Sequence, residues 1–276
     1  MKHLWIVAVA AIYLGFSHSI SHITPFHWAF VVFVSGLYVA HPKTRQFIKD
    51  AAPLFGFLVL YDFFPMIPQS WWGTVLIEQP YHWEQSLFGF QPAAWFQAHH
   101  FWLLDLMGAF FYFLHFVSFL FFALFLWWRS PTHFKRFGWA FFLTNAAWML
   151  TVLWIPTAAP WVVAQHGFAP PLLNLTGDAA GLLRFDQLVG RPFFENIYRS
   201  SHIVFGAFPS MHAAWPVLML FGIRGLALKK LAVAITLYGL GMAFSAVYLG
   251  HHYGVDLIAG WSYAVAFYFL TAIKIT

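Results

Sequence analysis

The feature that most limits how this chain can fold is a series of long apolar runs separated by short polar stretches. A helix needs about 20 mostly apolar residues to cross the hydrocarbon core of a bilayer. Only 8% of the residues are charged and 61% are hydrophobic, whereas about a quarter of a soluble domain is charged. We therefore predict an all-α integral membrane protein with about eight transmembrane helices. The runs are 4–20, 25–41, 51–68, 106–128, 138–156, 206–223, 230–249 and 254–273.

Two longer and more polar segments, 69–105 and 157–205, are expected outside the membrane core. The first is rich in tryptophan and has an amphipathic pattern, which predicts that it lies at the membrane interface. The N-terminal stretch MKHLWIVAVAAIYLGF begins like a signal peptide, but no small-x-small cleavage site clearly follows it. We therefore expect it to be a retained span.

The basic residues orient the chain, because cytoplasmic loops carry an excess of lysine and arginine. With eight spans, eleven of the 14 basic residues fall on one side, which we predict to be cytoplasmic: Lys2, Lys43, Arg45, Lys49, Arg129, Lys135, Arg136, Arg224, Lys229, Lys230 and Lys274. The exceptions, Arg184, Arg191 and Arg199, lie in segment 157–205 on the other side. These short clusters do not form a single basic face, so no nucleic-acid partner is expected. The absence of cysteine excludes disulfides and thiolate chemistry.

Polar side chains gather where three segments reach the non-cytoplasmic face. GHHYGVD (250–256) joins the last two spans, PSMH (209–212) opens the sixth run, and the arginines of 157–205 lie on the same face. Ionisable residues at membrane depth are functional candidates, since burying them is costly.

These residue types suit phosphoryl transfer without a metal. His252 and Asp256 are four residues apart, so on a helix the carboxylate can orient one ring nitrogen and leave the other as base or nucleophile. Pro209-Ser210 predicts a helix start whose free N–H groups suit a phosphate. The forked donors of Arg184 and Arg191 match phosphate oxygens. One histidine would attack phosphorus and the other, His212, would protonate the departing oxygen.

A zinc site is the alternative for His212, His251, His252 and Asp256. Adjacent histidines point to different faces of a helix, and nearby arginines would repel a cation, so we expect no metal. His115 falls inside an apolar run and is expected to make an interhelical hydrogen bond. Structural roles are expected for His3, His18, His22, His27, His41, His133 and His166.

Four stretches, PTAAPW (156–161), GLLRFDQLVG (181–190), FGAFPSMHAA (205–214) and YLGHHYGVD (248–256), carry a resemblance. Together they resemble the type-2 phosphatidic acid phosphatase superfamily, and within it the inositol phosphorylceramide synthase branch. The similarity runs from about the middle of the chain to its end. The resemblance implies a six-helix core, so we expect one membrane domain over 1–276 with two accessory spans in 1–50 and the catalytic core in 51–276.

The resemblance implies roles for individual residues. His252 would be the nucleophile, Asp256 would orient it and His212 would be the general acid. The expected substrate- or phosphate-binding residues are Arg184, Ser210, Arg191, His251, Ser245 and Asp186. The superfamily usually has Ser-Arg before the nucleophile, whereas this chain has Ser245 followed by Ala246; the synthase branch also lacks that arginine, which favours a transferase.

The expected activity is transfer of a phospho-headgroup, phosphoinositol from phosphatidylinositol, to a ceramide-like lipid alcohol through a phosphohistidine, without a cofactor. The partners are then a phospholipid donor and a lipid-alcohol acceptor, and no partner subunit is indicated. A lipid phosphatase of the same superfamily is the first alternative, and a lipid transporter or lipid-binding protein the second. The expected location is a bacterial inner membrane, or a Golgi membrane, with the active site on the non-cytoplasmic face.

Overall fold

The computed structural model describes residues 4–20, 23–170, 175–201 and 203–272. Lys2, Lys274, His3 and His22, which entered the predictions above, lie outside these ranges. All regular elements of the described residues are helices, and the predicted all-α class is confirmed. The α-helices are α1 (Leu4–Ile20), α2 (Pro25–Ala40), α3 (Pro42–Asp50), α4 (Ala52–Phe63), α5 (Glu78–Phe88), α6 (Pro92–Ala98), α7 (Trp102–Arg129), α8 (Pro131–Trp154), α9 (Pro160–His166), α10 (Leu182–Val189), α11 (Phe193–Arg199), α12 (Met211–Gly222), α13 (Lys229–Tyr248) and α14 (Gly254–Ala272). Two 3-10 turns, η1 (Phe64–Met66) and η2 (Gln69–Trp71), follow α4.

Four helices of the described residues are long and apolar enough to cross a membrane: α7, α8, α13 and α14. Four shorter apolar helices, α1, α2, α4 with η1, and α12, coincide with the other predicted runs. The abundance of apolar helices agrees with an integral membrane protein.

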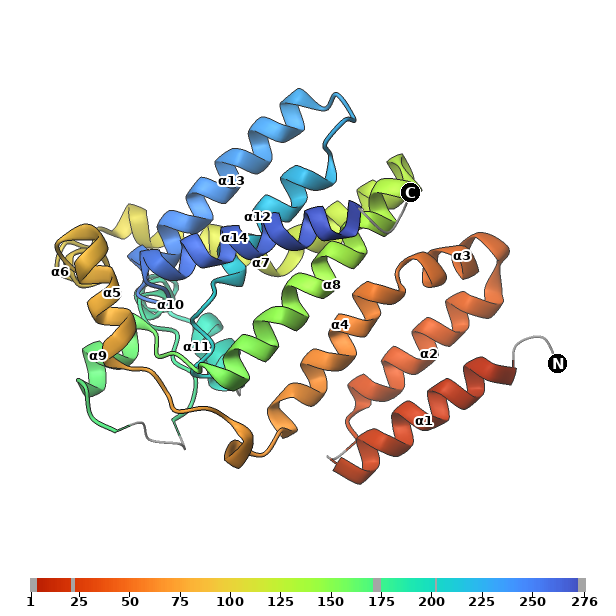
Figure 1. Ribbon diagram of the computed structural model, residues 1–276, viewed down its shortest axis with the longest axis horizontal. Helices are drawn as coiled ribbons and strands as arrows, with labels where there is room; N and C mark the ends of the chain where they lie inside the picture. Colours follow the sequence, from red (N-terminus) through yellow and green to blue (C-terminus); the bar gives the residue numbers. More distant parts are fainter. Residues whose placement is uncertain (1–3, 21–22, 171–174, 202, 273–276) are drawn as a thin grey trace. The chain divides into compact units, whose positions relative to one another are not determined.

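The chain forms two compact units, Met1–Ile67 and Pro68–Thr276. In the first unit α2 packs on α1 and α3, and α3 packs on α4. In the second unit α12 packs against α14, α13, α8 and α7, while α14 also packs on α8 and α13 on α7 (Figure 1). The short helices α5, α6, α9, α10 and α11 of this unit gather toward one end of the bundle (Figure 1).

One glycine lets two helices approach closely at the end where the predicted site lies. A Cβ atom at Gly260 of α14 would stand 2.1 Å from the backbone oxygen of Ser210. Real side chains do not tolerate such a contact, so glycine is required there. The start of α12 is thereby held directly against the first turns of α14.

Candidate active site

His212 and His252 lie together, as the sequence predicts. The Nδ1 atom of His212, on the first turn of α12, is 3.0 Å from the Nε2 atom of His252, in the loop before α14. The Nδ1 atom of His252 is 2.9 Å from the carbonyl oxygen of Ala207. A carbonyl only accepts hydrogen bonds, so this nitrogen must carry the ring proton. The Nε2 atom of His252 is then unprotonated, as a nucleophile requires, and its lone pair accepts the hydrogen bond from His212 Nδ1.

Asp256 lies behind His252 and is fully buried in the first turn of α14. Its Oδ2 atom is 3.5 Å from His252 Nδ1 and accepts a 2.8 Å hydrogen bond from the backbone N–H of Tyr253. Its Oδ1 atom is buried with no hydrogen-bond partner in the described structure. At this separation the carboxylate acts on His252 mainly through its charge, while Ala207 fixes the tautomer.

The PTAAPW stretch supports both histidine segments. The N–H of Thr157 donates to Phe205 O at 2.7 Å, and the N–H of Ala207 donates to Thr157 O at 3.3 Å. Farther along, the N–H of Trp161 donates to Gly250 O at 3.0 Å. One segment therefore positions the carbonyl that holds His252 and the loop that carries it, which gives this motif a physical role.

Ser210 occupies the N-cap of α12, so the predicted helix start is confirmed. Its Oγ atom accepts a long hydrogen bond of 3.4 Å from the N–H of Ala213, and its own N–H donates to the backbone oxygen of Asp256 at 2.9 Å. The remaining amides of the first helical turn are suited to an anion.

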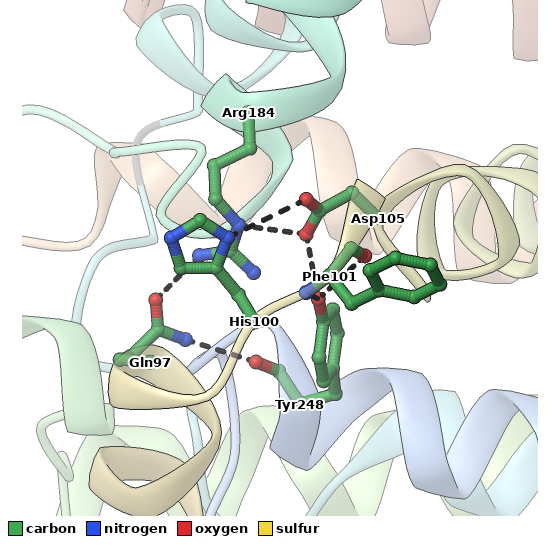
Figure 2. Close-up of polar contacts among 6 residues, drawn as sticks. All are labelled: Gln97, His100, Phe101, Asp105, Arg184 and Tyr248. Atoms are coloured by element: carbon green, nitrogen blue, oxygen red, sulfur yellow. Dashed lines mark hydrogen bonds and ion pairs between the residues drawn. The ribbon is translucent and has the colours of Figure 1, made fainter. Parts of the chain in front are cut away.

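Arg184 lies on α10 in a network of polar side chains (Figure 2). Its Nε atom is 2.7 Å from Asp105 Oδ1, and its Nη1 atom donates to Gln97 Oε1 at 2.6 Å. The hydroxyl of Tyr248 donates to the same Asp105 oxygen at 2.7 Å. The buried Nη2 atom of Arg184 has no partner in the described structure. The guanidinium is thus held in place with a donor left for a ligand.

The sequence analysis missed Asp105, Gln97 and Tyr248 as partners of Arg184. They come from α7, the α6 segment and α13 (Figure 2). Asp105 lies 79 residues from Arg184 in sequence. The only local signal was an acidic residue at the start of a long apolar run, which is unusual in a membrane helix.

Three other predicted binding residues are exposed or bonded to the backbone. Arg191 is exposed in the turn after α10. Both oxygens of the buried Asp186 accept backbone N–H groups of Phe194 and Glu195, at 3.1 and 2.8 Å, which caps the start of α11. The Ser245 hydroxyl donates to Gly241 O within α13 at 2.7 Å. These contacts give Asp186 and Ser245 structural functions, and their substrate contacts remain predictions.

His251 is buried beside the pair and belongs to the same loop as His252. Its Nε2 atom is 3.1 Å from the carbonyl of Ala179, and its ring stacks on Tyr112 and Tyr198 with centroids 5.1 and 4.6 Å away. Burial, with a smaller contribution from the charge of His252, lowers the pKa of His251 to about 3. The ring is therefore neutral at physiological pH.

Glu84 is another buried residue that the sequence analysis missed. It lies on α5 and is fully buried. Its two oxygens accept the backbone N–H groups of Gly254 and Val255 at 2.9 and 3.2 Å. A carboxylate at a helix N-terminus is favourable, and this one fixes the start of α14 two residues before Asp256. Burial raises the pKa of Glu84, which opposes its charged form.

His115 of α7 also lies at the site. Its ring centroid is 4.2 Å from that of His212 and 4.2 Å from that of Trp215. Its Nδ1 atom is buried with no hydrogen-bond partner in the described structure, so the interhelical bond expected for His115 is not made through this nitrogen. In the described part of the chain, no group of three or more His, Cys, Asp or Glu residues is arranged to hold a metal ion.

Comparison with known families identifies the class of protein that this arrangement belongs to. The sequence model described as the PAP2 superfamily matches residues 78–270. The chain therefore belongs to the PAP2 superfamily, and the match includes every site residue discussed above.

Three individual relatives are similar to the chain. The chain is 32% identical over 221 residues to an inositol phosphorylceramide synthase of Candida albicans, covering 79% of this chain and 47% of that protein. It is 28% identical over 271 residues to a phosphoinositol dihydroceramide synthase of Bacteroides thetaiotaomicron, covering 95% of this chain and 88% of that protein. An inositol phosphorylceramide synthase catalytic subunit of Schizosaccharomyces pombe is 26% identical over 81% of this chain. The chain spans about half the length of the two fungal proteins, 47% and 53%. No solved structure is significantly similar.

Proposed function

We propose that this chain is an integral membrane phosphotransferase that moves phosphoinositol from phosphatidylinositol to the hydroxyl group of a ceramide-type lipid alcohol. The observation that carries the proposal is the 3.0 Å pairing of His212 with His252. The choice of substrates is supported by a relative named phosphoinositol dihydroceramide synthase, which this chain matches over 88% of that protein's length. The reaction needs no metal or cofactor in this scheme.

In the first step the lone pair on His252 Nε2 attacks phosphorus. The bond between phosphorus and the diacylglycerol oxygen breaks, and doubly protonated His212 gives that oxygen a proton. Binding of the anionic phosphodiester beside His212 favours this protonated form. Asp256 balances the positive charge that develops on His252 as the phosphohistidine forms.

In the second step the acceptor hydroxyl replaces diacylglycerol. Neutral His212 removes the hydroxyl proton, the oxygen attacks phosphorus, and the bond to His252 Nε2 breaks. Arg184, through its unpaired Nη2 atom, and the amides near Ser210 would hold the phosphoryl oxygens as charge builds. We assign secondary substrate contacts to Arg191, His251, Asp186 and Ser245.

The membrane arrangement is part of the proposal. All eight apolar helices would cross, with α4, α7, α8, α12, α13 and α14 as the six-helix core and α1 and α2 as accessory spans. The active site would open on the non-cytoplasmic face, in a bacterial inner membrane. A Golgi membrane is the alternative location.

A lipid-product assay tests the proposal. Purified protein in detergent receives labelled phosphatidylinositol, a short-chain ceramide and EDTA, and the lipid products are separated. We expect an inositol-phosphate-bearing ceramide together with diacylglycerol. If no transfer occurs and the protein instead releases phosphate from phosphatidic acid, the chain is a lipid phosphatase and the proposal is wrong.

A further inference from the structure

Two buried polar atoms on α7 have no partner and lie beside the reacting histidines. The hydroxyl of Tyr112 and the Nδ1 atom of His115 are both buried without a hydrogen bond in the described structure. Tyr112 is 0% and His115 is 7% exposed. Leaving a buried polar group unpaired costs about 1–3 kcal/mol, so two such groups on one helix face require an explanation.

The geometry places both residues against His212. They are three residues apart on α7 and therefore share a face. The Tyr112 ring stacks on the His212 ring at 4.7 Å and 25°, and the His115 ring lies at 4.2 Å and 33°. These are face contacts, so neither polar atom is satisfied by His212. Trp215, which backs His115, already donates its own N–H to Asn145 at 3.2 Å.

The chemistry of this pair differs from that of the Arg184 network. Arg184 presents a fixed positive charge, suited to phosphate oxygens. Tyr112 offers a phenol hydroxyl and His115 an imidazole Nδ1 atom, and neither atom is bonded to a carboxylate or arginine among the described residues. Uncharged donors and acceptors in an apolar setting suit a neutral ligand with hydroxyl or amide groups.

We propose that Tyr112 and His115 form the subsite that binds the polar head of the neutral lipid alcohol, holding its hydroxyl next to His212. This inference rests on the proposed function and specifies where its acceptor binds. The hydroxyl would reach phosphorus from the side of His212, which takes its proton, while the phosphoryl oxygens face Arg184. Bound acceptor would satisfy the two atoms that are unpaired in its absence.

The test compares wild-type protein with Tyr112→Phe, which removes only the hydroxyl, and His115→Phe, which keeps a flat ring of slightly larger size without the polar nitrogens. The measured quantities are the KM for short-chain ceramide, the KM for phosphatidylinositol, and the ratio of transfer to hydrolysis by water. Each variant should raise the ceramide KM about five- to tenfold, as expected for one lost hydrogen bond. The phosphatidylinositol KM should stay within twofold, and the transfer-to-hydrolysis ratio should fall by a similar factor.

Matched controls make the same chemical changes elsewhere in the unit. Tyr238→Phe removes a buried hydroxyl that contacts Ser118, and His133→Phe removes an imidazole bonded to Ser130 and to Arg224 O. Neither should change the acceptor KM. A second readout compares two acceptors, ceramide and a fatty alcohol of equal chain length that lacks the amide, in the wild type and in Tyr112→Phe. The ratio of kcat/KM for ceramide to kcat/KM for the alcohol should be about fivefold smaller in Tyr112→Phe than in the wild type.

The outcomes separate the two proposals. If the wild type does not transfer phosphoinositol, the proposed function fails and the subsite falls with it. If the wild type transfers but both variants keep the ceramide KM and the transfer ratio within twofold, the subsite alone is wrong. A loss of hydrolysis equal to the loss of transfer, in folded variants, would also overturn it, because that pattern places these residues in the chemistry rather than in acceptor binding. Should His115→Phe not fold, Tyr112→Phe and the alcohol comparison still decide.

Discussion

Two histidine–aspartate pairs, His27–Asp62 in the first compact unit and His252–Asp256 in the second, differ in the burial and hydrogen bonding of their side chains. In the first unit His27 Nε2 lies 3.0 Å from Asp62 Oδ2, while His27 Nδ1 accepts from the N–H of Thr24 at 3.1 Å. In the second unit His252 Nδ1 lies 3.5 Å from Asp256, and His252 Nε2 faces another imidazole.

The two carboxylates also differ in exposure and in hydrogen bonding. Asp62 is 24% exposed in its side chain and also accepts from the hydroxyl of Tyr13. Asp256 is fully buried and keeps one oxygen without a partner in the described structure. The first pair therefore ties helices together, whereas the second keeps one buried carboxylate oxygen without a partner in the described structure, behind a histidine whose Nε2 atom faces His212. Unused capacity, more than the presence of His and Asp, marks a site that acts on a ligand.

Replacing one histidine of each pair tests the difference between the two pairs, and the largest effect on turnover is expected here. His252→Ala should lower turnover at least about 10⁴-fold, because no phosphohistidine can form. His27→Ala should keep turnover within about threefold and destabilise the protein by about 1–3 kcal/mol through the lost buried hydrogen bonds. Turnover and thermal unfolding of both purified variants in detergent would be measured. A His252→Ala protein with more than a tenth of wild-type turnover would mean that the nucleophile lies elsewhere.

Replacing the aspartates gives a smaller but sharper comparison. Asp256→Asn should lower kcat about 10²–10³-fold, since the charge that stabilises the phosphohistidine is lost. The loss should be less than that of His252→Ala, because the Ala207 carbonyl still holds the proton on Nδ1. Asp62→Asn should leave kcat within twofold. An Asp256→Asn protein as inactive as His252→Ala would show that Ala207 does not fix the tautomer.

The sequence predicted the central pair because its signals are local. His252 and Asp256 are only four residues apart, although His252 lies in the loop before α14 and not on the helix as expected. Pro209-Ser210 before His212 is a helix-start pattern. The apolar runs likewise predicted the positions of α7, α13 and α14 to within about four residues, since length and hydropathy suffice for that. The run at 138–156 missed the more polar first two turns of α8, which begins at Pro131. The synthase-like resemblance is confirmed by the superfamily match and by the relatives.

The rest depends on contacts between residues far apart in the chain. Arg184 and Asp105 are separated by 79 residues, and Glu84 lies 170 residues before Gly254. No periodicity or motif indicates such pairs in a single sequence. Asp186 has a contact that its place in GLLRFDQLVG did not indicate, because both its oxygens accept the backbone amides at the start of α11. Its substrate contact remains a prediction.

The smallest expected effect concerns His251 of the second compact unit and tests whether a histidine beside the active site also stabilises the fold. It stacks between Tyr112 and Tyr198, its Nε2 atom meets Ala179 O, and His252 is its nearest titratable neighbour in the loop. Its folded-state pKa of about 3 lies below the ordinary value of about 6.5. The unfolded chain therefore binds a proton before the folded one does. The stability that neutral His251 provides is complete above about pH 6.5 and is lost as the pH falls toward 3.

At about 1.4 kcal/mol per pH unit, the stability lost on going from pH 6.5 to pH 5 through this residue is about 2 kcal/mol. Chemical denaturation in detergent at pH 7, 6 and 5 would measure it, with His251→Phe as the variant because phenylalanine keeps the stacked ring and cannot be protonated. Glu84 has a raised pKa and acts in the opposite sense, since its folded form binds a proton more readily. Because Glu84 is present in both proteins, its contribution cancels in the difference between the two curves of unfolding free energy against pH. If the wild-type curve is parallel to that of His251→Phe, His251 is not held neutral by its burial.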